Sequence, residues 1–140
     1  MSLVAITQAW RALFNLIDGQ GDIAQALYQR ATHNMSQLGM AISLSYYEAI
    51  CAYNERIGDL PTAISMRDQQ LEAVQGKGGY YLEAESLLKK ARLLGRMGKD
   101  TEVILEQAFA VSHQLLKPQL FLHNLQRIQD GDFSDTIDSA

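Results

Sequence analysis

Three histidines and one cysteine are the side chains of this 140-residue chain best suited to metal binding or nucleophilic catalysis. His33, His113 and His123 lie far apart, and none has a second ligand at the helical spacing that a zinc site on one helix requires. Cys51 lies in an apolar segment, where a thiol is expected to be buried and unreactive. We therefore predict that the protein is not an enzyme, with no catalytic residues, no metal site and no cofactor.

Two short motifs have part of the spacing of a ligand-binding loop. The stretch 76–79, Gly-Lys-Gly-Gly, lacks the Ser or Thr after Lys and the preceding strand that a phosphate-binding loop needs, so we expect a turn between helices. Asp130, Asp132 and Asp135 have the spacing of calcium ligands, but the central glycine and the terminal glutamate of such a loop are missing. Neither motif predicts a binding site.

Composition predicts a folded chain, with 47% apolar and 20% charged residues. The net charge is −4 and the twelve Lys and Arg residues are scattered, so we expect no nucleic-acid partner. No apolar run approaches the roughly 20 residues that span a bilayer, and the first residues do not resemble a secretory signal, so we expect no membrane partner. The single cysteine offers no disulfide partner, which favours a cytoplasmic location.

Apolar residues recur at spacings of three and four over seven segments, which predicts an all-α fold with about seven helices. The first helix is expected from about Leu3 to Asp18, and the apolar residues expected to share one of its faces are Ile6, Trp10, Leu13, Phe14 and Ile17. The third is expected over roughly 41–57, and Pro118 is expected to open the seventh. No segment shows the sustained alternation typical of strands.

A glycine followed by an aspartate separates successive helical segments. The series comprises Gly21-Asp22, Gly58-Asp59, Gly98-Lys99-Asp100 and Gly131-Asp132, at separations of 37, 40 and 33 residues. Asp22, Asp59 and Asp100 are expected to cap the helices that follow. This period is typical of two-helix repeats that stack into a solenoid, and a plain helical bundle is the alternative.

The residues around these pairs resemble the tetratricopeptide repeat superfamily. The matching segments are Trp10-x-x-Leu13 with Gly21-Asp22-Ile23-x-x-Ala26-Leu27, Tyr47-x-x-Ile50-Cys51 with Gly58-Asp59-Leu60-x-x-Ala63-Ile64, and Leu87-x-x-x-Ala91 with Gly98-x-x-x-x-Val103-Ile104. The units are longer than usual, as in divergent repeats of bacterial signalling and regulatory proteins. The resemblance implies a right-handed superhelix of antiparallel helix pairs, with Ala26 and Ala63 as the small residues of the second helices. Phe14 departs from the pattern, because a small residue is expected there.

The resemblance covers about residues 7–132 and implies one domain over residues 1–140. Its repeats are expected at approximately 3–39, 40–78 and 79–117, with a partial copy at 118–140. That incomplete last copy favours a chain cut from a longer protein.

The resemblance also implies a concave groove lined by the first helix of each repeat. The residues expected to bind a peptide or partner there are Gln8, Arg11, Asn15, Asp18, Ser45, Glu48, Glu55, Glu85, Lys89 and Arg92. Some family members clamp a terminal carboxylate at such positions, and Arg11, Asn15 and Arg92 match, whereas Glu48 and Glu55 would repel a carboxylate. An ordinary solvated helix face is the alternative interpretation.

Two functions follow as hypotheses. The first is a non-enzymatic module that binds a peptide or helix of a protein partner in the groove. The alternative is a sensory or dimerisation region of a bacterial signalling or transcription-regulatory protein. In that case the C-terminal helix would form a homodimer through Phe121, Leu122, Leu125 and Ile128.

Overall fold

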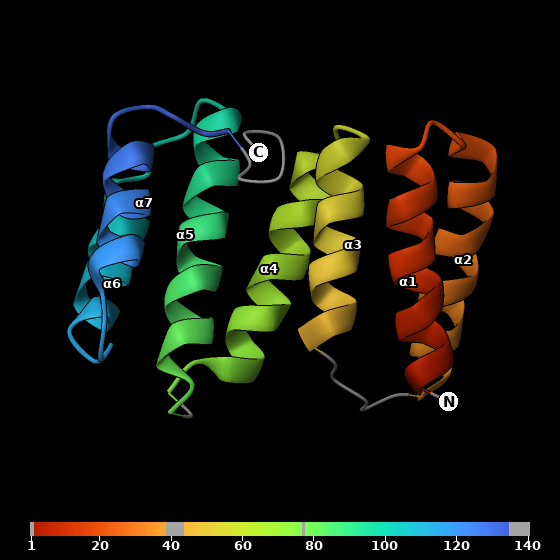
Figure 1. The fold of residues 1–140 in the computed structure, drawn as a ribbon, viewed down its shortest axis with the longest axis horizontal. Coiled ribbons are helices and arrows are strands. Elements are labelled where there is room, and N and C mark those ends of the chain that lie inside the picture. Colours follow the sequence, from red (N-terminus) through yellow and green to blue (C-terminus); the bar gives the residue numbers. More distant parts are fainter. Residues whose placement is uncertain (1, 39–43, 77, 135–140) are drawn as a thin grey trace. The chain divides into compact units, whose positions relative to one another are not determined.

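The computed structural model describes residues 2–38, 44–76 and 78–134, and within these ranges every regular element is a helix. The seven helices are α1 (Ser2–Ile17), α2 (Gly21–Leu38), α3 (Leu44–Arg56), α4 (Leu60–Val74), α5 (Tyr80–Arg96), α6 (Glu102–Ser112) and α7 (Gln119–Gln129) (Figure 1). The all-α class and the number of helices predicted from the sequence are confirmed. The start expected for the third helix lies outside the described residues.

The chain forms two compact units, residues 1–66 and 67–140, and the boundary falls inside α4. Each unit has its own buried side chains and is described separately below. The expectation of a single repeat domain remains a prediction.

Five of the helices end at a glycine in the left-handed backbone conformation: α1, α3, α5 and α7, and also α4, where Gly76 has a φ of 72°. Gly19, Gly58, Gly98 and Gly131 have φ between 72° and 90°. After α3, the Gly58 N–H donates to the Glu55 carbonyl at 3.1 Å, and the next N–H donates five residues back to Asn54 at 2.9 Å. The ends of α1, α5 and α7 repeat both bonds, whereas at the end of α4 the Gly76 N–H donates to Glu83 Oε1. The two backbone bonds satisfy the last carbonyls of α1, α3, α5 and α7, and glycine adopts this turn without the steric penalty of a Cβ atom.

The structure corrects the first member of the glycine series. Gly19 ends α1, whereas Gly21 is already the first residue of α2. Asp22 therefore does not cap α2 as expected. It lies inside the first turn, where a carboxylate still interacts favourably with the positive end of the helix.

The two later aspartates do accept hydrogen bonds from the start of a helix. Asp59 caps α4, because its Oδ1 accepts from the Thr62 N–H at 3.2 Å. Asp100 Oδ1 accepts from the Glu102 N–H at 2.9 Å, although the capping position of α6 belongs to Thr101, one residue later than expected.

Starting the series at Gly19 also changes which alanine is the small residue of α2. Ala24 follows Gly19 by the same interval that separates Ala63 from Gly58, and both alanines are fully buried. Ala26, which the resemblance had placed in this role, is exposed. The prediction for Ala63 is confirmed and the one for Ala26 is wrong.

In the first unit, small side chains fill the contact between α1 and α2. The fully buried residues on the two helices are Ala5, Ala9, Ala12, Ala24 and Ala31. Alanines at these spacings let the two helices approach closely, and Leu13 and Leu27 are buried on the same helices. Tyr28 packs against the cluster that contains Ala12 and Ala24, where it stacks on Tyr53 of α3 with ring centroids 4.3 Å apart. Asn54, also buried, donates to the Tyr28 hydroxyl oxygen at 3.0 Å.

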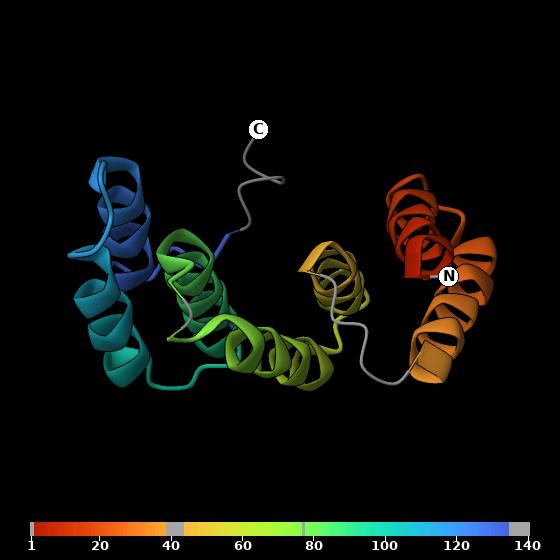
Figure 2. The same cartoon turned by 90° about the horizontal axis from the view of Figure 1, so that it is seen from below.

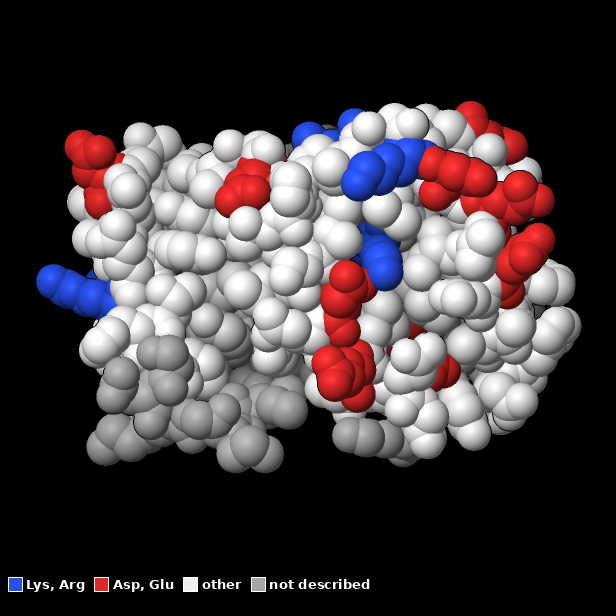
Figure 3. All heavy atoms as spheres, turned by 180° about the vertical axis from the view of Figure 1, so that it is seen from behind, with Lys and Arg blue, Asp and Glu red and all other residues white. Residues whose placement is uncertain are grey.

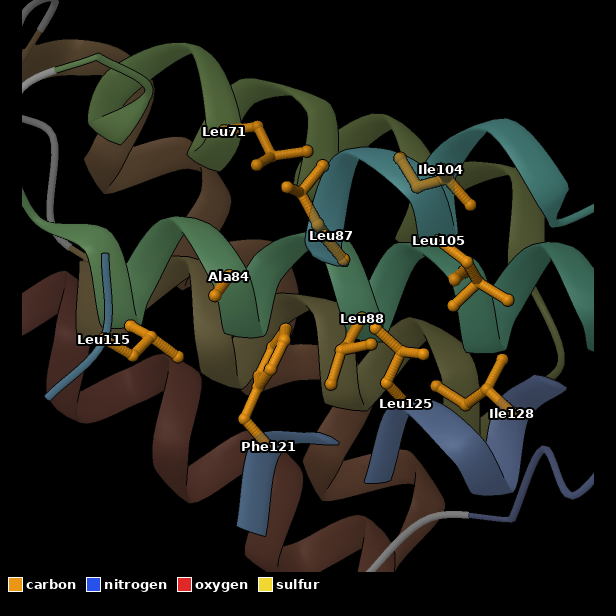
Figure 4. Packing of buried hydrophobic residues seen from close by; sticks show 12 residues of the cluster. Leu71, Ala84, Leu87, Leu88, Ile104, Leu105, Leu115, Phe121, Leu125 and Ile128 are labelled. Atoms are coloured by element: carbon orange, nitrogen blue, oxygen red, sulfur yellow. The ribbon is translucent and has the colours of Figure 1, made fainter. Parts of the chain in front are cut away.

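In the second unit, larger apolar side chains from every helix form the core. Leu88 of α5 lies with Phe121, Leu125 and Ile128 of α7 (Figure 4). Figures 1 and 2 both show α6 and α7 beside α5 in this unit. The glycine-rich turn before α5 is fastened by the buried Glu83, whose Oε1 accepts from the Gly76 N–H at 3.0 Å.

The glycine stops generate a stability prediction. Gly58→Ala is expected to lower the free energy of unfolding by about 1–2 kcal/mol, because an L-residue with a Cβ disfavours a φ of 85°. Urea denaturation followed by circular dichroism measures the change.

Gly21→Ala is the matched control, since Gly21 has open space around its Cα and lies in a helix. It is expected to leave stability unchanged or raise it by up to about 1 kcal/mol. If both variants lose the same stability, the left-handed conformation of Gly58 is not what makes this residue the helix stop, and the assignment is contradicted.

Candidate functional site

On α1, two of the four predicted site residues are available to a partner. Arg11 and Asp18 are exposed. Gln8 is engaged with α2, because its Oε1 accepts from Asn34 Nδ2 at 2.7 Å. Asn15 Nδ2 donates to the Arg11 carbonyl at 2.7 Å, so this amide is turned back onto its own helix.

On α3, the predicted row becomes progressively more buried along the helix. Ser45 is exposed and its Oγ accepts from the indole Nε1 of Trp10 at 2.7 Å. Glu48 is half-buried, and Glu55 is only 8% exposed. A partner on this side of the first unit would therefore meet Ser45 and Glu48 but not Glu55.

On α5, in the second unit, the predicted residues differ strongly in exposure. Glu85 is exposed and Lys89 is half-buried. Arg92 is 9% exposed, and its Nη1 lies 3.5 Å from the carbonyl oxygen of Phe133, to which it donates. The end of the chain's own described part thus covers this arginine. Neither unit by itself presents Arg11, Asn15 and Arg92 as a carboxylate clamp.

A surface that the sequence did not predict lies beside Arg11. Phe14 is 55% exposed and stacks on Trp10 with ring centroids 5.9 Å apart and an interplanar angle of 30°. We call Trp10, Arg11, Phe14 and Ser45 the Trp10–Phe14 surface. The hydrogen bond to Ser45 fixes the indole, and the indole in turn supports the phenyl ring.

The apolar face expected on α1 is divided in the structure, and the expectation for Phe14 is wrong. The buried side of α1 carries Ala5, Ala9 and Ala12 with Leu13, whereas Phe14 lies outside this stripe. Ile17, 40% exposed, lies on the outward side as well. The sequence did contain a signal for this exposure, because Phe14 is a large apolar residue at a position where the repeat pattern expects a small one.

The residues expected to mediate self-association occupy the core of the second unit. Phe121, Leu125 and Ile128 are 6–7% exposed, and Leu122 is half-buried against the same cluster (Figure 4). The expected exposed apolar stripe on α7 is therefore wrong, because α5 and α6 already cover it. The exposed positions of α7 are polar apart from Leu120, which is 72% exposed. Homodimer formation itself remains a prediction.

Charged and metal-binding groups do not gather into a site in the described part of the chain. Figure 3 shows acidic and basic groups close together on one face, without a large area of one sign among the residues drawn there in colour. Lys90 pairs with Asp68 at 2.6 Å. Of the residues described, no three His, Cys, Asp or Glu side chains come close enough to hold a metal ion. Nor is any described helix long and apolar enough to cross a membrane.

Comparison of the chain with protein-family models, with curated proteins and with solved structures gives no match. The tetratricopeptide resemblance therefore remains a prediction from the residues quoted above.

The aromatic cluster of the first unit generates a prediction for alkaline pH. Burial, together with the smaller effects of Tyr28 and Tyr47, raises the pKa of Tyr46 to about 12. The unfolded tyrosine titrates near 10.0, so the unfolded state loses its proton first. The contribution of Tyr46 to the free energy of unfolding should therefore be constant below pH 10, and it should lower that free energy progressively between pH 10 and about 12.

Tyr46→Phe is expected to make that decline shallower, as measured by urea midpoints on both sides of pH 10. Tyr80→Phe, at an exposed position of α5, is the control and should leave the decline as it is. The same slope for wild type and Tyr46→Phe would contradict the role of Tyr46.

Proposed function

We propose that this protein is a helical-repeat module that binds a segment of another protein through the Trp10–Phe14 surface of its first unit. The observation that carries the proposal is the exposed ring of Phe14, stacked on a tryptophan that is itself held by Ser45. Trp10 packs against the core of the unit, but the exposed part of the Phe14 ring contributes nothing to that core. Its exposed area is available for a partner to cover.

The composition of this surface is that of an interaction hot spot. Trp, Tyr and Arg contribute most of the binding energy in protein interfaces, especially where their side chains are already ordered. Trp10 has little rotamer freedom left to lose, because Ser45 and Phe14 both contact it. The exposed guanidinium of Arg11 would pair with a carboxylate of the partner and select an apolar segment that carries an acidic residue.

Helical pairs suit this role because they hold the surface rigid. The glycine stops that end α1, α3, α5 and α7 with the same two backbone hydrogen bonds support a repeated two-helix unit, and repeats of this period stack into a solenoid. In such a stack the first helices present one continuous row. The proposal is that Arg11, Phe14 and Ser45 belong to this row and meet a peptide or helix there.

Selection from a randomised peptide library displayed on phage tests the proposal. Wild-type protein is expected to enrich peptides that share an aliphatic or aromatic anchor next to Asp or Glu. Phe14→Ala should weaken binding of the enriched peptides at least about tenfold, equivalent to about 1.4 kcal/mol, as measured by fluorescence anisotropy. Arg11→Glu should weaken the binding of the enriched peptides that carry an acidic residue by a similar factor, and this loss should be smaller at high salt.

Arg30→Glu changes an exposed arginine of α2, outside the Trp10–Phe14 surface, and is the charge-matched control. It should leave affinity within about twofold of wild type, since rim charges contribute little. Enriched peptides that bind Phe14→Ala and Arg11→Glu as tightly as wild type would refute the proposed site. Failure to enrich any common motif would refute peptide recognition as the function.

A further inference from the structure

Gly95 is a glycine in a helical position that does not call for one. It lies in the last turn of α5, inside the helix, and the left-handed stop is supplied by Gly98, three residues later. Glycine is the poorest helix former after proline, so its presence here needs a reason other than backbone conformation. The reason is space, because Gly95 is buried and a Cβ atom added to it would meet another side chain.

That side chain is Phe133. A Cβ on Gly95 would lie 2.2–2.5 Å from three atoms of the Phe133 ring, far inside van der Waals contact. The ring therefore rests on the bare backbone of α5, in a notch that only glycine provides. Phe133 belongs to no helix. It lies two residues after Gly131, on the segment that leaves α7 and returns to α5 (Figure 2).

Polar groups hold the residues on both sides of the ring. Arg127 Nε donates to Asp132 Oδ2 at 3.0 Å, and Arg127 Nη2 donates to Ser134 Oγ at 3.1 Å. Arg92 Nη1 donates to the Phe133 carbonyl oxygen at 3.5 Å. Hydrogen bonds from the Ser134 side chain and backbone, and then from Arg127, lower the pKa of Asp132 to about 2, so its carboxylate is charged at neutral pH.

We propose that the notch at Gly95, with Arg92 and Arg127 beside it, is a binding site for an extended protein segment containing an acidic residue followed by an aromatic one. In the free chain this site is filled by Asp132 and Phe133. Each feature of the inferred ligand has its counterpart in that internal contact: a ring on Gly95, a carboxylate on Arg127, and a backbone carbonyl facing Arg92. The site lies in the second unit and does not depend on the Trp10–Phe14 surface.

The internal ligand is attached in a way that allows exchange. Phe133 is only half-buried and Ser134 is exposed, so part of the ring already faces solvent. Residues 132–134 lie outside the helices, with the Asp132 N–H donating to the Arg127 carbonyl at 2.8 Å, and short segments of this kind open locally at lower cost than the helices. The link to α7 is short, so the internal ring has a high effective concentration and an external segment must compete against it.

Removing the internal ring tests the proposal directly. The probe is a blocked pentapeptide with the sequence of residues 130–134, Asp-Gly-Asp-Phe-Ser, titrated to millimolar concentration into ¹⁵N-labelled full-length chain. In Phe133→Ala, saturable shifts are expected at the Gly95 amide and the Arg92 and Arg127 side chains. Wild type should need at least about tenfold more peptide for the same shifts, because its own Phe133 competes.

Three matched reagents define the outcome. The peptide with Ala in place of Phe should not bind, and Gly95→Ala combined with Phe133→Ala should remove binding because the Cβ fills the notch. Phe109→Ala removes an exposed aromatic ring of α6 and should leave the peptide affinity of wild type unchanged. A folded Phe133→Ala chain that shows no saturable shift at Gly95 would overturn the proposal, as would equal binding by the Gly95→Ala double variant.

If Phe133→Ala does not fold, wild type labelled with 4-fluorophenylalanine supplies the decisive measurement. The fluorine signal of Phe133, assigned with Phe133→Leu, is expected to move toward its solvent-exposed value as peptide is added. A Phe133 signal that stays fixed at saturating peptide would overturn the proposal independently of the variants.

Discussion

The left-handed glycine that ends α1, α3, α5 and α7 with the same two backbone hydrogen bonds is the constraint on which the rest of this structure depends. Each such residue ends a helix after its last carbonyls are satisfied and turns the chain so that the next helix can begin within a few residues. Without that turn, α1 would not be followed closely enough by α2 for their alanines to meet. The same turn after α7 sends Phe133 back toward α5. The pairing of the helices and the covering of Arg92 by Phe133 thus both follow from the glycine turn.

The helices could be predicted from the sequence because their periodicity is local information. The stops were only partly predictable, since Gly19 and Gly21 are both plausible from composition and only the backbone conformation distinguishes them. Choosing Gly21 placed Asp22 and Ala26 in the wrong roles, while Asp59 and Ala63 were assigned correctly because Gly58 has no competing glycine nearby. Because the roles in α2 were assigned by counting from this glycine, choosing the one two residues later also misplaced the residues that follow it.

The exposed or buried state of individual site residues was less predictable, because it depends on what packs from elsewhere in the chain. Phe14 is exposed because the buried side of α1 is taken by the alanine stripe, and Arg92 is covered by Phe133, about forty positions later. A helical period tells which residues share a face, but not whether the neighbour across that face is a small side chain, a large one or solvent. Arg11 and Asp18 kept their predicted exposure because no other element covers that side of α1 in the first unit.

The contact between Gly95 and Phe133 has a consequence for how the protein can change over evolutionary time. A side chain at position 95 and a ring at position 133 exclude each other, because they would occupy the same volume. A substitution at either position alone would leave a clash or an empty notch, so the two are expected to change together. Related chains should carry either glycine at position 95 with an aromatic residue at position 133, or a larger residue at position 95 with a small one at position 133. This covariation would be detectable from their sequences alone.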